Sequence, residues 1–305
     1  RIWWLREGDS RLSLPSELPR RMQFGTLPVE MPAALRRYRP GEWHLAWTIR
    51  PGRRALSNPL QAGGAYLVGT WESTVEAYAL ANGAPLWRLQ KKEPVYAMSV
   101  ASPSLLLAGE GLHESGAAAL TAVRLPEGTP LWQREFRGHI ESAPTYSEKF
   151  AAVWVGSGPA GLWSLNARIG SVNWHARVGH VDSTPLLAPG DLLLLSSQPN
   201  ESVKESTLWA LRPADGSVSW SLALPGQPWG SPQLDSATGL VLVSTGVGQI
   251  GVKRADDRGW AHAVSLVERK IAWSADLGGN PIEKSILARG LAIYVLTKGE
   301  VVALH

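Results

Sequence analysis

The stretch LWALRPADGSVSW, residues 208–220, decides the fold because it repeats LWSLNARIGSVNW, residues 162–174. Each copy is an apolar strand that reaches a leucine, a turn that contains a glycine, and a second strand that ends in tryptophan. Gly170 and Gly216 supply the positive φ that a tight hairpin turn requires. The two tryptophans are 46 residues apart, which is the length of one four-stranded propeller blade.

The same pattern extends along the chain in both directions. Successive tryptophans of this kind are separated by 40, 45, 42, 46 and 53 residues. An apolar strand precedes each leucine strand, and four of the units begin with a proline, which is tolerated at the first residue of a strand. The tryptophans of the repeat are Trp47, Trp87, Trp132, Trp174, Trp220 and Trp273.

The sequence therefore predicts an all-β protein, a β-propeller of about six four-stranded blades. The last unit, residues 271–305, supplies three strands, whereas the tryptophan strand at residues 42–50 has no three strands before it. The last unit thus lacks one strand, and the N-terminal strand lacks a blade. We therefore expect the N-terminal strand to close the last blade and remove the exposed sheet edges. The predicted domains are an extended basic N-terminal arm at residues 1–41 and the propeller at residues 42–305.

This repeat resembles that of the PQQ-like, or quinoprotein-type, propeller family over about residues 43–305. In that family the repeated tryptophans form a girdle that docks each blade onto the next. The resemblance implies this structural role for all six tryptophans of the repeat. It implies the fold more strongly than any function, because one fold carries many functions.

Catalytic chemistry is not indicated by the residues. The chain has no cysteine, which excludes disulfides, cysteine-ligated zinc and thiol catalysis. The family includes PQQ-dependent dehydrogenases, but the sequence shows no recurring cluster of Asp, Glu and Asn that would hold their calcium ion. We therefore predict no catalytic residue, no cofactor and no enzyme activity, with a PQQ-dependent dehydrogenase as the weakest alternative.

The seven histidines show no metal-binding spacing such as HExxH. His175 and His180 flank one turn with Asp182 close by, and this trio could bind a metal. The sequence favours the simpler interpretation, in which the three residues lie in a surface loop. We accordingly predict no metal site.

Positive charge is concentrated at the N-terminus. Residues 1–54 hold 11 arginines and 5 acidic residues, whereas the rest of the chain holds 19 basic and 21 acidic residues. The propeller itself is therefore not expected to bind nucleic acid. Tryptophan beside arginine suits a membrane interface, so the arm is predicted to contact a partner or a membrane surface, the alternative being a basic linker. The residues proposed for this contact are Trp3, Trp4, Arg6, Arg20, Arg21, Arg36 and Arg37.

Three insertions fall at the same place in different units, after the apolar second strand, at residues 109–117, 198–206 and 246–259. We expect them on one face of the propeller, where loops usually bind partners. The favoured function is a non-catalytic scaffold for protein–protein interaction at the cell envelope. It resembles the propeller subunit of the outer-membrane β-barrel assembly machine, which has eight blades. The alternative is a ligand-sensing extracytoplasmic domain of a larger receptor or kinase.

The chain begins with Arg1 rather than methionine, which indicates a processed or trimmed chain. The predicted location is periplasmic or extracytoplasmic, with membrane anchoring through a removed N-terminal segment as a further expectation. The expected partners are membrane-associated proteins.

Overall fold

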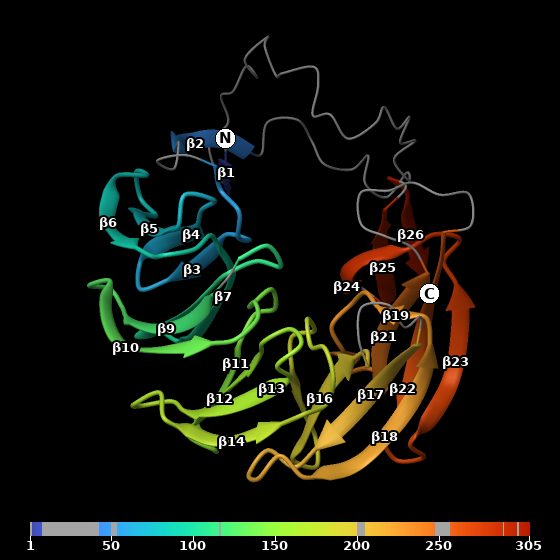
Figure 1. The fold of residues 1–305 in the computed structure, drawn as a ribbon. Coiled ribbons are helices and arrows are strands. Elements are labelled where there is room, and N and C mark those ends of the chain that lie inside the picture. Colours follow the sequence, from blue (N-terminus) through green and yellow to red (C-terminus); the bar gives the residue numbers. More distant parts are fainter. Residues whose placement is uncertain are drawn as a thin grey trace.

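The computed structural model describes residues 2–7, 43–49, 54–115, 117–199, 205–247, 257–288, 290–297 and 299–305. Within these ranges all the regular structure is β, and six antiparallel sheets follow one another around an arc (Figure 1). No helix in the described part of the chain is long and apolar enough to cross a membrane.

The first three sheets are four-stranded and use their strands in chain order. Their strands are β3 (Leu60–Ala62), β4 (Ala65–Gly69), β5 (Thr74–Ala79) and β6 (Pro85–Gln90); β7 (Val95–Ser102), β8 (Leu105–Glu110), β9 (Ala118–Arg124) and β10 (Thr129–Phe136); and β11 (Thr145–Ser147), β12 (Ala152–Gly156), β13 (Leu162–Asn166) and β14 (Val172–Ala176).

The remaining three sheets differ in strand number. The fourth has four strands, the fifth has five because its innermost strand is split, and the sixth has three. Their strands are β15 (Leu186–Ala188), β16 (Leu192–Ser197), β17 (Glu205–Leu211) and β18 (Val218–Pro225); β19 (Gln227–Pro228), β20 (Gln233–Leu234), β21 (Leu240–Val247), β22 (Arg258–Ser265) and β23 (Lys270–Asp276); and β24 (Pro281–Ala288), β25 (Leu291–Leu296) and β26 (Val301–Leu304).

In the first five sheets the second strand forms the core because both of its faces are covered. Every side chain of β4 and β12 is buried, which explains why these strands read as continuous apolar runs instead of alternating. The hydrophobic clusters join neighbouring sheets: Leu107 of the second sheet shares one with Val153 and Val155 of the third. Each junction between blades is therefore itself a core.

Hydroxyl groups link the innermost strands of neighbouring sheets. Ser99 donates from its Oγ to the carbonyl of Pro144 at 2.6 Å, and the Thr145 hydroxyl donates to the carbonyl of Pro185. Further along the arc, Ser285 donates to Gln233 at 2.7 Å. The prolines at the strand entries thus keep a carbonyl that serves as an acceptor for the preceding blade.

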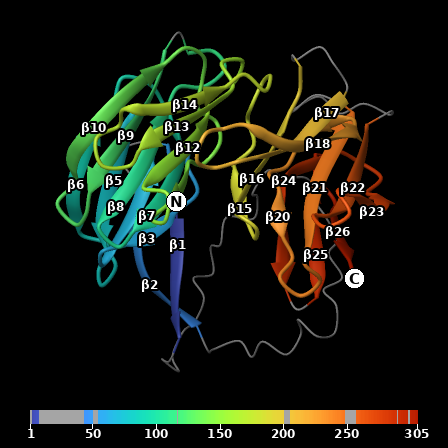
Figure 2. The same cartoon turned by 90° about the horizontal axis from the view of Figure 1, so that it is seen from below.

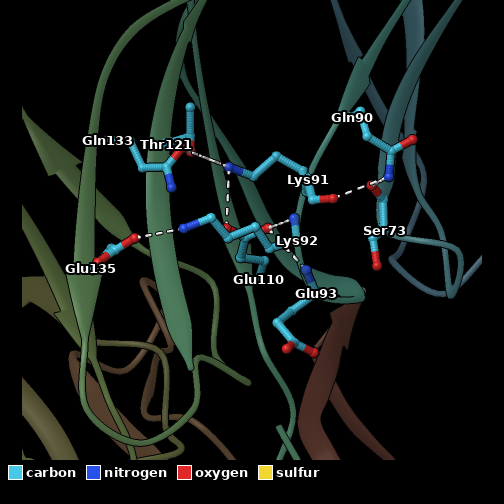
Figure 3. Close-up of polar contacts among 9 residues, drawn as sticks. All are labelled: Ser73, Gln90, Lys91, Lys92, Glu93, Glu110, Thr121, Gln133 and Glu135. Atoms are coloured by element: carbon cyan, nitrogen blue, oxygen red, sulfur yellow. Dashed lines mark hydrogen bonds and ion pairs between the residues drawn. The ribbon is translucent and has the colours of Figure 1, made fainter. Parts of the chain in front are cut away.

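A buried ion pair joins the first and second blades (Figure 3). Lys91 lies between β6 and β7, and its Nζ is 3.4 Å from Oε1 of Glu110 at the end of β8. The same Nζ donates to Thr121 at 2.5 Å and to Gln133 at 3.2 Å. Burial lowers the pKa of Lys91, and the Glu110 charge opposes this shift.

The predicted closure of the ring is wrong in this structure. The strand expected at residues 42–50 exists as β2 (Trp43–Ile49), but it pairs with β1 (Ile2–Glu7) and not with β26. These two strands lie beside the first blade in both views (Figures 1 and 2), and Ile49 packs into the cluster of Tyr66 and Val68. The physical reason is that Ile2–Leu5 is itself a strand-forming run, which pairs Trp4 with Trp47 in register.

Candidate functional site

Three of the repeat tryptophans make the same contact with the next blade. Trp87 donates from Nε1 to the carbonyl of Pro126 at 2.6 Å. Trp132 donates to Ala167 at 2.9 Å, and Trp174 to Pro213 at 3.0 Å. Each acceptor belongs to the turn between the third and fourth strands of the following sheet. The indole N–H, which is costly to bury alone, is therefore paired.

The glycines of those turns lie against the indole rings. A Cβ at Gly170 would come within 2.6 Å of Trp132, and one at Gly216 within 2.5 Å of Trp174. Gly170 also has a φ of 70°. Glycine is therefore required twice at this position, first by the turn and then by the ring that packs on it.

The other repeat tryptophans are placed differently. Trp220 is buried in the cluster shared by the fourth and fifth sheets, and the corresponding turn carries Arg269 at a φ of 56° in place of glycine. Trp273 is 41% exposed. Trp47 lies in β2, and the position of its indole is outside the described part. A docking role for all six tryptophans remains a prediction.

A cluster of imidazoles lies where three connections between strands meet. His113 comes from the loop between β8 and β9, within the insertion predicted at residues 109–117. His139 lies between the second and third sheets, and His180 and Asp182 lie between the third and fourth. Ligand atoms of these four residues, here called the histidine cluster, are all within 4.8 Å of one another.

Asp182 is the centre of this histidine cluster. Its Oδ1 is 2.9 Å from Nε2 of His139, and its Oδ2 is 2.8 Å from Nε2 of His180. His113 places its Nε2 3.9 Å from Asp182 and stacks on His139 with a centroid distance of 3.7 Å. Three rings from separate connections thus surround one carboxylate.

The electrostatics of the histidine cluster follow from this geometry. Burial alone would raise the pKa of Asp182, but hydrogen bonds from His139 and His180 hold that pKa well below its ordinary value. Asp182 is therefore an anion whose charge is directed at the imidazoles. The rings of His139 and His180 are buried, whereas His113 is 43% exposed and covers the cluster from outside.

The structure corrects the predicted trio. His175 is not near Asp182; it stacks on Trp163 at 3.8 Å, and its ring nitrogen lies 2.6 Å from the carbonyl of Ala160. His180 is buried, so the surface-loop interpretation is wrong for it. The arrangement brings in His113 and His139, which sequence reasoning did not connect with Asp182.

One sequence signal could have found the histidine cluster. GHIESAP at residues 138–144 and GHVDSTP at residues 179–185 are the same motif, with histidines 41 residues apart. That spacing is one blade, so the two histidines occupy equivalent positions in adjacent connections. His113 had no such signal because it comes from an inserted loop. His113 reaches Asp182 only because the loop between β8 and β9 folds towards the histidine cluster.

Other predicted site residues are only partly covered by the structure. Trp3, Trp4 and Arg6 lie in β1, while Arg20, Arg21, Arg36 and Arg37 lie outside the described residues. The insertion at residues 198–206 begins beside the histidine cluster, where the backbones of His180 and Gln198 exchange hydrogen bonds of 2.7 and 3.2 Å. Residues 200–204 of that insertion and residues 248–256 of the one at residues 246–259 lie outside the described ranges.

The donor set does not suit the calcium-bound quinone of the dehydrogenases that share this fold class. Calcium takes six to eight oxygen ligands, whereas this cluster offers three imidazoles and one carboxylate. It is the candidate metal group among the residues that the structure describes. The residues of this cluster therefore do not fit that cofactor.

Solved structures with this fold include a BamB protein and several dehydrogenases. BamB from Moraxella catarrhalis is similar with a TM-score of 0.63 and 14% identity, over 86% of this chain and 76% of that one. A quinohemoprotein alcohol dehydrogenase from Comamonas testosteroni gives 0.64 and 14%, over 82% and 57%. A europium-containing methanol dehydrogenase gives 0.62 and 11%, over 84% and 69%. Identities this low establish the fold alone.

The sequence comparison is more specific than the fold comparison. No curated protein sequence matches the chain. A family model described as outer membrane protein assembly factor BamB matches residues 44–222 and again residues 108–305. Together these matches cover all six blades of the propeller. The chain therefore belongs to the BamB-like family of PQQ-type β-propellers.

Proposed function

We propose that this chain is a non-catalytic propeller scaffold that binds proteins during outer-membrane protein assembly, on the periplasmic side of the envelope. The family match supports the process, and one structural feature supports protein binding. That feature is an apolar surface on the last sheet.

The apolar surface is a row of three cross-strand neighbours, here called the β24–β26 stripe. Ile282 pairs with Val295, and Val295 pairs with Val301. Directly paired residues point to the same face of a sheet. Their exposed fractions are 45%, 43% and 60%. Three neighbouring apolar side chains on an exposed sheet face support the proposal that another protein covers this surface.

The opposite face of the same sheet shows why the stripe is unusual. Tyr294 and Leu296 are buried there, in a cluster with Leu277 of the preceding blade. A sheet with one solvated face normally alternates apolar and polar residues. This sheet is apolar on both faces, so its second face is suited to contact with a further surface.

A copurification experiment tests this function. The full chain, produced in a bacterial periplasm, is purified from detergent-solubilised envelopes, and the bound proteins are identified by mass spectrometry. We expect a component of the outer-membrane assembly machinery to copurify. Val295→Lys should lower its recovery roughly tenfold, because a charge in an apolar contact costs more than 1.4 kcal/mol of binding free energy.

The matched control is Val267→Lys, because Val267 is 92% exposed in a turn of the fifth sheet, away from the stripe. Recovery with this control should equal that of the unaltered chain. Circular dichroism melts must show that both variants fold. The proposal fails if no assembly component is recovered, or if a folded Val295→Lys chain recovers as much of it as the control.

A further inference from the structure

Four side chains in the histidine cluster are already spaced as the corners of a small coordination shell. Zinc binds histidine nitrogen and carboxylate oxygen at 2.0–2.2 Å, so neighbouring ligand atoms in a tetrahedral site are about 3.3 Å apart. The separations from the Asp182 oxygens to Nε2 of His180, His139 and His113 are 2.8, 2.9 and 3.9 Å. These values lie on both sides of the required spacing.

The outer contacts of the histidine cluster also fit metal binding. Metal-ligating histidines typically pass their second ring N–H to a carboxylate, which fixes the tautomer and the orientation of the ring. His113 does this: its Nδ1 is 2.7 Å from Oε1 of Glu141. The same oxygen accepts the backbone N–H of His113 at 2.6 Å. Glu141 therefore holds the loop so that Nε2 of His113 is directed at Asp182.

Hydrogen bonding to Asp182 explains only part of this arrangement. Two imidazoles lie at hydrogen-bond distance from Asp182, but His113 at 3.9 Å is beyond that range. Its ring is nevertheless stacked on His139 and only 5.5 Å from the ring of His180. Because His113 and Asp182 are the solvent-exposed members of the histidine cluster, an ion could enter from their side.

We propose that His113, His139, His180 and Asp182 bind one divalent transition-metal ion of the zinc class, with Glu141 positioning His113. Three nitrogens and one oxygen favour zinc over calcium or magnesium, which prefer oxygen ligands. The bound ion joins the inserted loop of the second blade to the connections on both sides of the third blade. The site is independent of the function proposed above.

Titration of the metal-free full chain with Co²⁺ and Zn²⁺ tests the proposal. Co²⁺ reports geometry through its visible absorption, and we expect the intense bands of a tetrahedral site at one equivalent per chain. Zn²⁺ should displace the Co²⁺ and give one calorimetric site. His113→Asn should weaken Zn²⁺ binding at least 100-fold, because it removes a ligand. Glu141→Gln should weaken it 10- to 100-fold, as loss of an outer-shell partner does.

The control is His175→Gln, which removes a histidine of the same region that lies outside the cluster. It should leave the Zn²⁺ affinity unchanged. His113 is exposed on a loop, so His113→Asn is expected to fold, and a thermal melt checks this. The proposal is overturned if the unaltered chain gives no tetrahedral Co²⁺ spectrum. It is equally overturned if folded His113→Asn binds Zn²⁺ as tightly as His175→Gln.

Discussion

At the scale of single residues, the contact between indole and glycine can be separated from the cost of the turn. Gly170 and Gly190 both have positive φ, 70° and 81°, but only Gly170 has a ring packed against it. Alanine at Gly190 should cost about 1–2 kcal/mol for the left-handed backbone alone. Alanine at Gly170 should cost about 1–3 kcal/mol more, because it overpacks Trp132. Urea unfolding of both variants measures the difference, and equal losses would contradict the indole contact.

His262 provides a second residue-scale prediction, which concerns pH. It is buried between the hydroxyls of Thr245 and Ser274, at 3.0 and 2.8 Å, and burial lowers its pKa from 6.5 to about 4. As pH falls from 6.5 towards 4, His262 becomes protonated in the unfolded chain but stays neutral in the folded chain. The free energy of unfolding therefore decreases over this range. The loss is at most about 3 kcal/mol. Well above pH 6.5 His262 is neutral in both states and contributes no pH dependence.

Replacing His262 with glutamine tests this by keeping polar atoms at the site while removing the titration. The unfolding free energy of His262→Gln should change less between pH 6.5 and 4 than that of the unaltered chain. All other residues are identical in the two proteins, so their contributions cancel in the comparison. Parallel pH profiles for the two proteins would show that His262 is not buried in its neutral form.

At the scale of structural elements, the junction of the first two blades depends on the buried pair of Lys91 and Glu110. Lys91→Met should lower the unfolding free energy by about 3–5 kcal/mol, since it leaves Glu110 buried without its counter-charge. Lys92→Met is the matched control, because Lys92 pairs with Glu135 in solvent. We expect no measurable change in the control. Chemical denaturation compares the two, and equal effects would mean that the pair is solvated.

The elements also show what the sequence could and could not predict. The blades followed from the repeat because the leucine strand, the glycine turn and the tryptophan are all local features. The partner of β2 could not be predicted from the sequence. Backbone hydrogen bonds between strands do not depend on residue type, and Ile2–Leu5 can form a strand as readily as β26. The histidine cluster combines residues from three connections. Two of them share a motif, but His113 reaches the cluster only through the fold of its loop.

At the scale of the whole molecule, six sheets form an arc whose last member carries an apolar stripe on the face opposite its buried cluster. Hydrophobic cores between neighbouring blades stabilise the arc, as do the indole hydrogen bonds to a turn of the following sheet. These contacts have a structural role. The histidine cluster and the β24–β26 stripe lie in different parts of the arc. Metal binding at the first and protein binding at the second are therefore separable by mutation.

Position-specific cross-linking is the most direct test of the scaffold function. A photoreactive amino acid is placed at Val295 in one chain and at Val267 in another, and each is irradiated in intact envelopes. We predict that the probe at Val295 forms an adduct with a component of the outer-membrane assembly machinery, and that the probe at Val267 forms none. Absence of an adduct at Val295, or equal adducts at both positions, would contradict the scaffold function.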